Sequence, residues 1–169
     1  MLTKNAKILQ SLLFLSPGSS FSIGFLEGND TQGNVKFIGS RLSYPSSYSL
    51  SQSIKLGSGT TPETENDYQI ETPLTGVSMS TPSYTTFFDE NENPTLAFDF
   101  TVTNNEATEK VLSEIALYGG LFGSNTKGAN ANTTYTFMID RTVLSTPITI
   151  PANGYAAVRY SIKLVLQSE

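Results

Sequence analysis

The C-terminal stretch Tyr155–Leu166 places the strongest constraint on the fold of this chain. Its apolar face carries Ala156, Val158, Tyr160, Ile162, Leu164 and Leu166, and Ala157, Arg159, Ser161, Lys163 and Val165 lie between them. A period of two puts alternate side chains on opposite faces of a strand, so the pattern predicts a strand with one buried face. The stretch Ser113–Tyr118, which reads Ser-Glu-Ile-Ala-Leu-Tyr, predicts a second strand of the same kind.

Short strand signals separated by turn residues continue through most of the chain. Two hairpins are predicted, Phe21–Leu26 with Asn34–Ile38 around the turn Glu27–Gly33, and Thr81–Phe88 with Thr95–Thr103 around Asp89–Pro94. The other expected segments are an extended connection at 39–52, strands at Val111–Tyr118 and Tyr135–Ile139, a long loop at Gly119–Ala131 and a proline-bounded edge strand at Pro147–Pro151.

Many short strands with frequent turn signals favour a mainly β fold, an antiparallel β-sandwich of the jelly-roll or immunoglobulin-like kind. A chain of 169 residues is long enough to bury a core without disulfides. We therefore expect a β-sandwich domain at 21–169, preceded at 1–20 by an arm or short helix. The predicted core comprises Leu96, Phe98, Phe100, Ile115, Leu117, Phe137, Ile139, Val158, Tyr160, Ile162 and Leu164.

The first twenty residues allow three readings. Lys4 and Lys7 precede an apolar run, Ile8–Leu15, which resembles the start of a signal peptide. An amphipathic helix that ends before Pro17-Gly18 is favoured instead, because Leu9, Leu12 and Leu13 share one helical face. An arm that docks on a neighbouring subunit fits equally well.

The absence of histidine and cysteine excludes several kinds of chemistry. Ser-His-Asp and Cys-His catalysis, histidine metal ligation and thiolate zinc sites all need these residues. The net charge is -5, and the ten basic residues are scattered singly, so neither a nucleic-acid surface nor a membrane surface is expected. Only 15% of the residues are charged, a profile typical of extracellular or particle-bound β proteins.

The segment Leu56–Leu74 contains a Gly-Ser-Gly sequence at 57–59 that suggests a phosphate cradle. A P-loop needs Gly-Lys-Ser/Thr, and a dinucleotide loop needs a third glycine after a strand. Neither is present, and Glu63 and Glu65 would repel phosphate, so no cofactor-binding residue is predicted. Thr61-Pro62-Glu63 instead predicts the start of a capped helical turn.

The densest acidic group is Asp89, Glu90 and Glu92. A glycosidase needs two carboxylates, but a hairpin turn explains these residues better through backbone hydrogen bonding. Their spacing also resembles the start of a calcium loop, although Pro94 and Phe100 stand where the loop needs Gly and an acid. No catalytic residue and no metal ligand is predicted, and an isolated surface calcium remains an alternative.

Glu114 has two candidate partners across the sheet, Arg141 and Arg159. An exposed pair of this kind contributes at most about 1 kcal/mol. We expect Glu114 to be a solvated charge.

Three segments together resemble a family of small tailed-bacteriophage virion structural proteins: Leu56–Leu74, Ser113–Tyr118, and Ile139–Gly154 followed by Tyr155–Leu166. The resemblance covers roughly residues 54 to 166, and the family usually has Gly where this chain has Ala116. It implies a β-sandwich head, neck or tail component without enzymatic activity or cofactor, located in the virion after assembly in the host cytoplasm. The implied partners are further copies of the chain, in a homo-oligomer, and other virion proteins.

Two segments are expected to make subunit contacts, residues 1–20 and residues 39–53, because they carry apolar and tyrosine side chains without a period that places them in the core. A carbohydrate-binding or adhesin-type β-sandwich module is the alternative function, because tyrosine-rich loops can stack on sugars. A lectin would bind glycan as a monomer, whereas a virion component should form a ring, trimer or lattice.

Overall fold

A computed structural model describes residues 3, 26–38, 54–91, 93–126 and 133–163. The protein is mainly β, and these residues form nine strands and no helix. The strands are β1 (Leu26–Asn29), β2 (Val35–Ile38), β3 (Ile54–Gly57), β4 (Val77–Met79), β5 (Ser83–Phe88), β6 (Pro94–Asn104), β7 (Lys110–Ser124), β8 (Thr133–Ile150) and β9 (Tyr155–Lys163).

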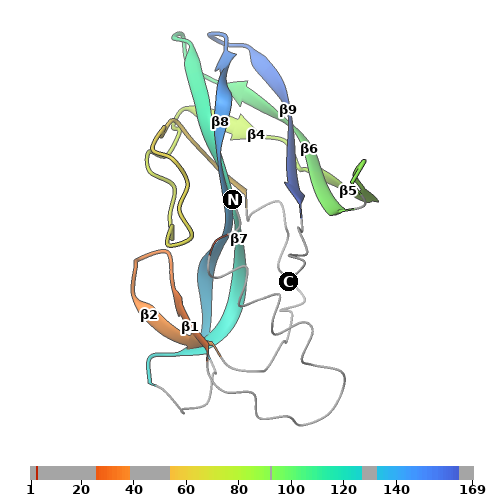
Figure 1. Cartoon of the computed structure of the whole chain (residues 1–169). Coiled ribbons are helices and arrows are strands. Elements are labelled where there is room, and N and C mark those ends of the chain that lie inside the picture. Colours follow the sequence, from red (N-terminus) through yellow and green to blue (C-terminus); the bar gives the residue numbers. More distant parts are fainter. Residues whose placement is uncertain (1–2, 4–25, 39–53, 92, 127–132, 164–169) are drawn as a thin grey trace. The chain divides into compact units, whose positions relative to one another are not determined.

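The strands form two sheets (Figure 1). One sheet has the order β1-β2-β7-β3, with β8 paired to β7, and the other has the order β4-β6-β5, with β9 paired to β6. Every pairing with a defined register is antiparallel. The predicted mainly β, antiparallel class is therefore confirmed.

Contacts within the chain divide it into two compact units, residues 1–73 with 114–144 and residues 74–113 with 145–169. The long strands β7 and β8 contribute to both units. The expectation of a single sandwich domain at 21–169 stays a prediction.

Strand β6 is the centre of the second unit. β9 pairs with it from Thr95 to Thr103, whereas β4 and β5 share its opposite edge. The hairpin predicted at 81–103 is thus confirmed. Phe98 lies opposite Tyr160, and their rings stack with centroids 6.1 Å apart. Along β9, the buried Val158, Tyr160 and Ile162 alternate with the exposed Arg159, Ser161 and Lys163.

Most of the predicted core is confirmed. The buried members are Phe98, Phe100, Ile115, Leu117, Phe137, Val158, Tyr160 and Ile162. Leu96 and Ile139 are half-buried, and Leu164 lies outside the described residues.

The prediction of one buried face for Ser113–Tyr118 is wrong. Every side chain from Leu112 to Tyr118 is buried. The reason is tertiary, because the segment 57–72 contacts the face of β7 that would otherwise be solvated, through Glu114 and Tyr118. Period-two reasoning cannot detect a strand that is covered on both sides.

Several predicted boundaries also need correction. The first described strand is β1 at Leu26–Asn29, so part of the expected turn Glu27–Gly33 is strand, and Phe21–Phe25 lies outside the described residues. The glycine-rich stretch after Tyr118 is not all loop, because β7 continues to Ser124. The residues expected to form a separate edge strand at Pro147–Pro151 are mostly the end of β8, whose pairing with β7 extends both strands.

Thr61-Pro62-Glu63 does not begin a helical turn. The Thr61 N–H donates instead to Oε2 of Glu71 at 3.0 Å, and its hydroxyl donates to Oε1 at 2.7 Å. A side chain ten residues away satisfies the donor that a helix start would have left open.

The two expected contact segments, 1–20 and 39–53, lie outside the described residues apart from Thr3. Thr3 is fully buried against β8, where its N–H and hydroxyl donate to the Ile139 and Met138 carbonyl oxygens, respectively. At this one position, the chain therefore contacts its own β8.

Candidate functional site

Glu114 lies in the first half of β7 and is 0% exposed. Its Oε1 accepts hydrogen bonds from the backbone N–H groups of Gly59 at 3.3 Å and Thr72 at 2.9 Å. Its Oε2 accepts from the Glu71 N–H at 3.2 Å and from Nε of Arg141 at 2.8 Å. A carboxylate offers about four acceptor positions, so the charge is fully solvated by the protein itself.

The Gly-Ser-Gly sequence forms part of this cradle. A Cβ added to Gly59 would lie 2.6 Å from Oε1 of Glu114, and one added to Gly57 would collide with the same oxygen. Glycine is needed here because the backbone approaches the carboxylate closely. The two glycines thus surround an anion that belongs to the protein itself, the side chain of Glu114.

Arg141 comes from β8 and is 3% exposed. Besides its bond to Glu114, its Nη1 donates to Oδ2 of Asp67 at 2.9 Å, and its Nη2 lies 3.6 Å from Oε2 of Glu71. Burial alone would lower the pKa of Arg141, but hydrogen bonds to Asp67 and Glu114 raise it above its usual value. One guanidinium therefore joins three carboxylates that approach it from β7 and from the segment 57–73.

The acidic residues of this segment fix its path over the sheet. Although burial alone would raise the pKa of Asp67, hydrogen bonds from Thr64 and Arg141 lower it. Burial also opposes ionisation of Glu63, yet its Oε1 accepts a 2.8 Å hydrogen bond from the Val143 N–H and its pKa is lowered. Both carboxylates are stabilised in their charged form by groups of the protein.

Tyr118 anchors the same segment by its hydroxyl, which accepts a 2.8 Å hydrogen bond from the Ile70 N–H. Its ring packs in a buried cluster with Ile70, Ala116 and Met138. Burial raises the pKa of Tyr118 to about 12. Glu114, Ala116 and Tyr118 alternate along β7, so one face of this strand holds the whole segment.

The environment of Glu114 differs from the one predicted from the sequence. Glu114 does pair with Arg141, but both groups are buried, so the expectation of a solvated charge is wrong. Arg159 is on the exposed face of β9, 3.8 Å from Asp99 and over the ring of Phe87. The available signal was the position of Glu114 within an otherwise uncharged run, Leu112–Tyr118.

The geometry gives this ion network a structural role. Glu114 is enclosed and already accepts hydrogen bonds at both oxygens, so it has no free direction in which to contact a substrate. Removing either partner would leave an uncompensated buried charge, which is strongly unfavourable. The network therefore fixes the segment 57–73 to the sheet.

A second buried cation, Lys36, belongs to β2. Lys36 is 8% exposed, and its Nζ donates to Oδ1 of Asn125 at 2.6 Å and lies 3.4 Å from Oδ2 of Asp30. The same ammonium sits 4.5 Å above the ring of Tyr135. It ties the β1–β2 hairpin to residues of β8 and of the turn after β7, and sequence patterning did not predict it.

Asp89 has the turn role that was expected of it. Its Oδ1 accepts from the N–H groups of Asn91 and Asn93, both at 2.9 Å, and Lys163 contacts Oδ2 at 2.9 Å. Glu90 is exposed beside it, and Glu92 lies outside the described residues. Among the residues that the structure describes, no group of three acidic side chains is arranged to hold a metal ion.

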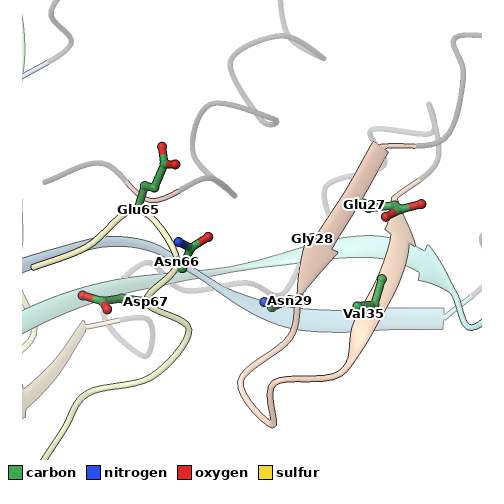
Figure 2. Close-up of a pocket in the computed structure, with 7 residues that line it drawn as sticks. All are labelled: Glu27, Gly28, Asn29, Val35, Glu65, Asn66 and Asp67. Atoms are coloured by element: carbon green, nitrogen blue, oxygen red, sulfur yellow. The ribbon is translucent and has the colours of Figure 1, made fainter.

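A small pocket of about 80 Å³ lies between the β1–β2 hairpin and the turn at 65–67 (Figure 2). Its lining comprises Glu27, Gly28, Asn29, Val35, Glu65, Asn66 and Asp67. Figure 2 shows the Asp67 carboxylate turned away from the hairpin, consistent with its bond to Arg141. The lining contains no aromatic ring on which a sugar could stack.

The most exposed apolar group in the described chain belongs to β5. Six large apolar side chains of the described residues are exposed. Three of the six lie in β5: Tyr84 (65%), Phe87 (39%) and Phe88 (72%). All six residues of β5 are exposed. This strand is the clearest candidate for an interaction surface.

Comparison of the chain with protein-family models, curated proteins and solved structures finds no match. Within the described ranges, no helix is long and apolar enough to cross a membrane.

Proposed function

We propose that this chain is a non-enzymatic structural component of a tailed-bacteriophage virion that assembles through repeated subunit contacts. The sequence resemblance points to this class, and the exposed aromatic strand β5 is the observation that supports it. An apolar edge strand is an aggregation liability on a free monomer, and a particle component hides such a surface by assembly.

The proposal includes the finer fold, a β-sandwich of jelly-roll or immunoglobulin-like kind. Antiparallel pairing in both sheets supports it, as does the burial of Ile115 and Leu117 on the face of β7 opposite the segment 57–73. The enclosed Glu114–Arg141 pair adds a reason for rigidity, because a buried ion pair with all its hydrogen bonds made favours one arrangement of the segment that it holds.

The test is to locate the chain in particles. Tailed-phage particles would be purified from a lysate in which this chain is produced, and the copies of the chain per particle counted by quantitative mass spectrometry. A fixed number of copies is expected, with hundreds indicating head decoration and six or twelve indicating the neck or tail. Absence of the chain from purified particles would refute the proposal.

Carbohydrate binding is the alternative to the proposed virion role. Tyr84 and Phe88 are exposed rings, and an adhesin could use such rings to stack sugars. A glycan array with the monomeric protein separates the two functions: specific glycan binding that is lost in Tyr84→Ser, without assembly, would identify a binding module.

A further inference from the structure

Strand β5 is an edge strand with one edge unused by the described residues. It pairs with β6 from Ser83 to Phe88, while β9 takes the opposite edge of β6. Figure 1 shows β6 between β9 and β5. Neither a charged residue nor a proline interrupts the sequence Ser-Tyr-Thr-Thr-Phe-Phe, so β5 lacks the usual features that block strand addition.

The hydrogen bonding of the adjoining turn determines which backbone groups face outward. The Asp89 N–H donates to the Asn93 carbonyl oxygen at 3.0 Å, and these two residues continue the β5–β6 register. Hydrogen-bonded and non-hydrogen-bonded pairs alternate along an antiparallel ladder. Tyr84, Thr86 and Phe88 are therefore the residues whose N–H and C=O groups point away from β6.

These three residues form a self-complementary edge. Two copies that pair edge to edge in one sheet are related by a two-fold axis perpendicular to that sheet, and this rotation leaves each side chain on the same face. Residues opposite each other in a ladder share a face, so the axis must lie beside a residue that pairs with the same residue of the second copy. With Thr86 at the axis, Tyr84 lies opposite Phe88 of a second copy, and Phe88 lies opposite its Tyr84. Every outward N–H and C=O of the three residues then has a backbone partner.

The neighbouring registers are worse. A centre at Thr85 places Phe88 opposite Pro82 of the second copy, which has no N–H to donate. A centre at Phe87 places Tyr84 opposite Glu90, which brings an acid into the ladder and removes the aromatic pair. The register centred on Thr86 alone keeps Pro82 and Glu90 beyond its paired residues.

We infer that a second copy of this chain pairs with β5 in antiparallel fashion, with a two-fold axis at Thr86 and the two Tyr84–Phe88 pairs stacked on either side. The contact would join the two four-stranded sheets into one continuous sheet. This inference rests on the proposed function for its premise that copies of the chain meet, and it adds which edge they share and in which register.

The chain contains no cysteine, so a single introduced thiol reports the register without ambiguity. In Thr86→Cys, the two thiols would face each other across a pair whose Cα atoms are about 5.5 Å apart, within the disulfide range of about 4.4–6.8 Å. Mild oxidation of the full-length protein should give a covalent dimer. Thr85→Cys is the matched control, because its thiol would face Phe87 and lie beyond disulfide reach of its counterpart.

A charge substitution gives a second, independent readout. Thr86→Lys places two ammonium groups opposite each other and should raise the dimer dissociation constant at least about tenfold in sedimentation analysis. Ser161→Lys, on the exposed face of β9, should leave association unchanged. Circular dichroism of each variant verifies that it is folded.

The outcomes distinguish the two proposals. Cross-linking through Thr85→Cys but not Thr86→Cys, or association that is insensitive to Thr86→Lys, would overturn the β5 contact while leaving a role in the virion intact. Efficient cross-linking of Thr86→Cys by a chain that is absent from purified particles would retain the β5 contact and refute the virion role.

Discussion

Arg141 donates a 2.8 Å hydrogen bond from Nε to Oε2 of Glu114, and neither residue is more than 3% exposed. The two residues come from β8 and β7, and the segment 57–73 supplies the remaining donors to the carboxylate. The buried ion pair thereby fixes the irregular segment 57–73, because an unpaired charge in the core would be strongly unfavourable.

Arg141→Met should destabilise the protein by about 3–5 kcal/mol, because it leaves Glu114 as a buried charge without its cationic partner. Urea unfolding monitored by circular dichroism measures the loss. Arg159→Met is the control, since the Arg159 side chain is 57% exposed, and we expect its effect to stay within about 1 kcal/mol. Equal effects of the two substitutions would show that the buried pair is not special.

Gly59→Ala should cost about 1–3 kcal/mol, because an added Cβ would lie 2.6 Å from both Oε1 of Glu114 and Cβ of Glu71. The neighbouring substitution Ser58→Ala adds no atom to this contact and should change the unfolding free energy by less than about 0.5 kcal/mol. Unfolding midpoints of the two variants decide the matter. A neutral Gly59→Ala would mean that the loop moves freely away from the carboxylate.

Asn104→Asp should be more damaging than Asn105→Asp. The buried Asn104 amide donates to the carbonyl oxygens of Thr108 at 2.7 Å and Pro151 at 3.0 Å. A carboxylate there would face carbonyl oxygens without a proton to share, for an expected cost above about 1–3 kcal/mol. Asn105 is exposed, so its substitution should be nearly neutral in thermal unfolding. The reverse ranking would contradict the assigned hydrogen bonds.

The Asp89 turn should make stability depend on pH in the acid range. Its bonds with Lys163 and Asn93 lower the pKa of Asp89 to about 2. The folded-state pKa lies below the unfolded value. Ionised Asp89 therefore contributes to the free energy of unfolding above pH of about 4, and this contribution is lost as pH falls toward 2. The urea midpoints of the wild type and Asp89→Asn should differ at pH 5 and converge near pH 2. A constant difference would exclude titration of this carboxylate.

Tyr118 should act at the opposite end of the pH scale. Burial raises its pKa to about 12, so its contribution is complete below pH of about 10 and is lost as pH rises toward 12. Tyr118→Phe removes this alkaline titration but leaves the Ile70 N–H without its acceptor, at a cost of about 1–3 kcal/mol at neutral pH. Ultraviolet titration of the two proteins should show one fewer late-ionising tyrosine in the variant.

The sequence by itself determined the strands whose one face is buried. Alternation of residue types predicted β6 and β9, and in β9 exposed and buried side chains do alternate. The polar turn between β5 and β6 predicted the hairpin that these two strands form. The turn Asp89–Pro94 could also be predicted from the sequence, because its hydrogen bonds are local: the Asp89 side chain accepts from the backbone N–H groups two and four residues further along. No long-range information was needed for these elements.

Only the tertiary structure decided what covers β7 and where its charge goes. Glu114 lies 55 residues from Gly59 and 27 from Arg141, so its environment depends on segments that alternation cannot bring together. In the sequence, the Gly-Ser-Gly stretch and the acids of 57–73 had the composition of a solvated loop. In the structure, the backbone of this segment covers β7 and donates hydrogen bonds to Glu114, because a carboxylate in a buried strand needs hydrogen-bond donors from the protein itself.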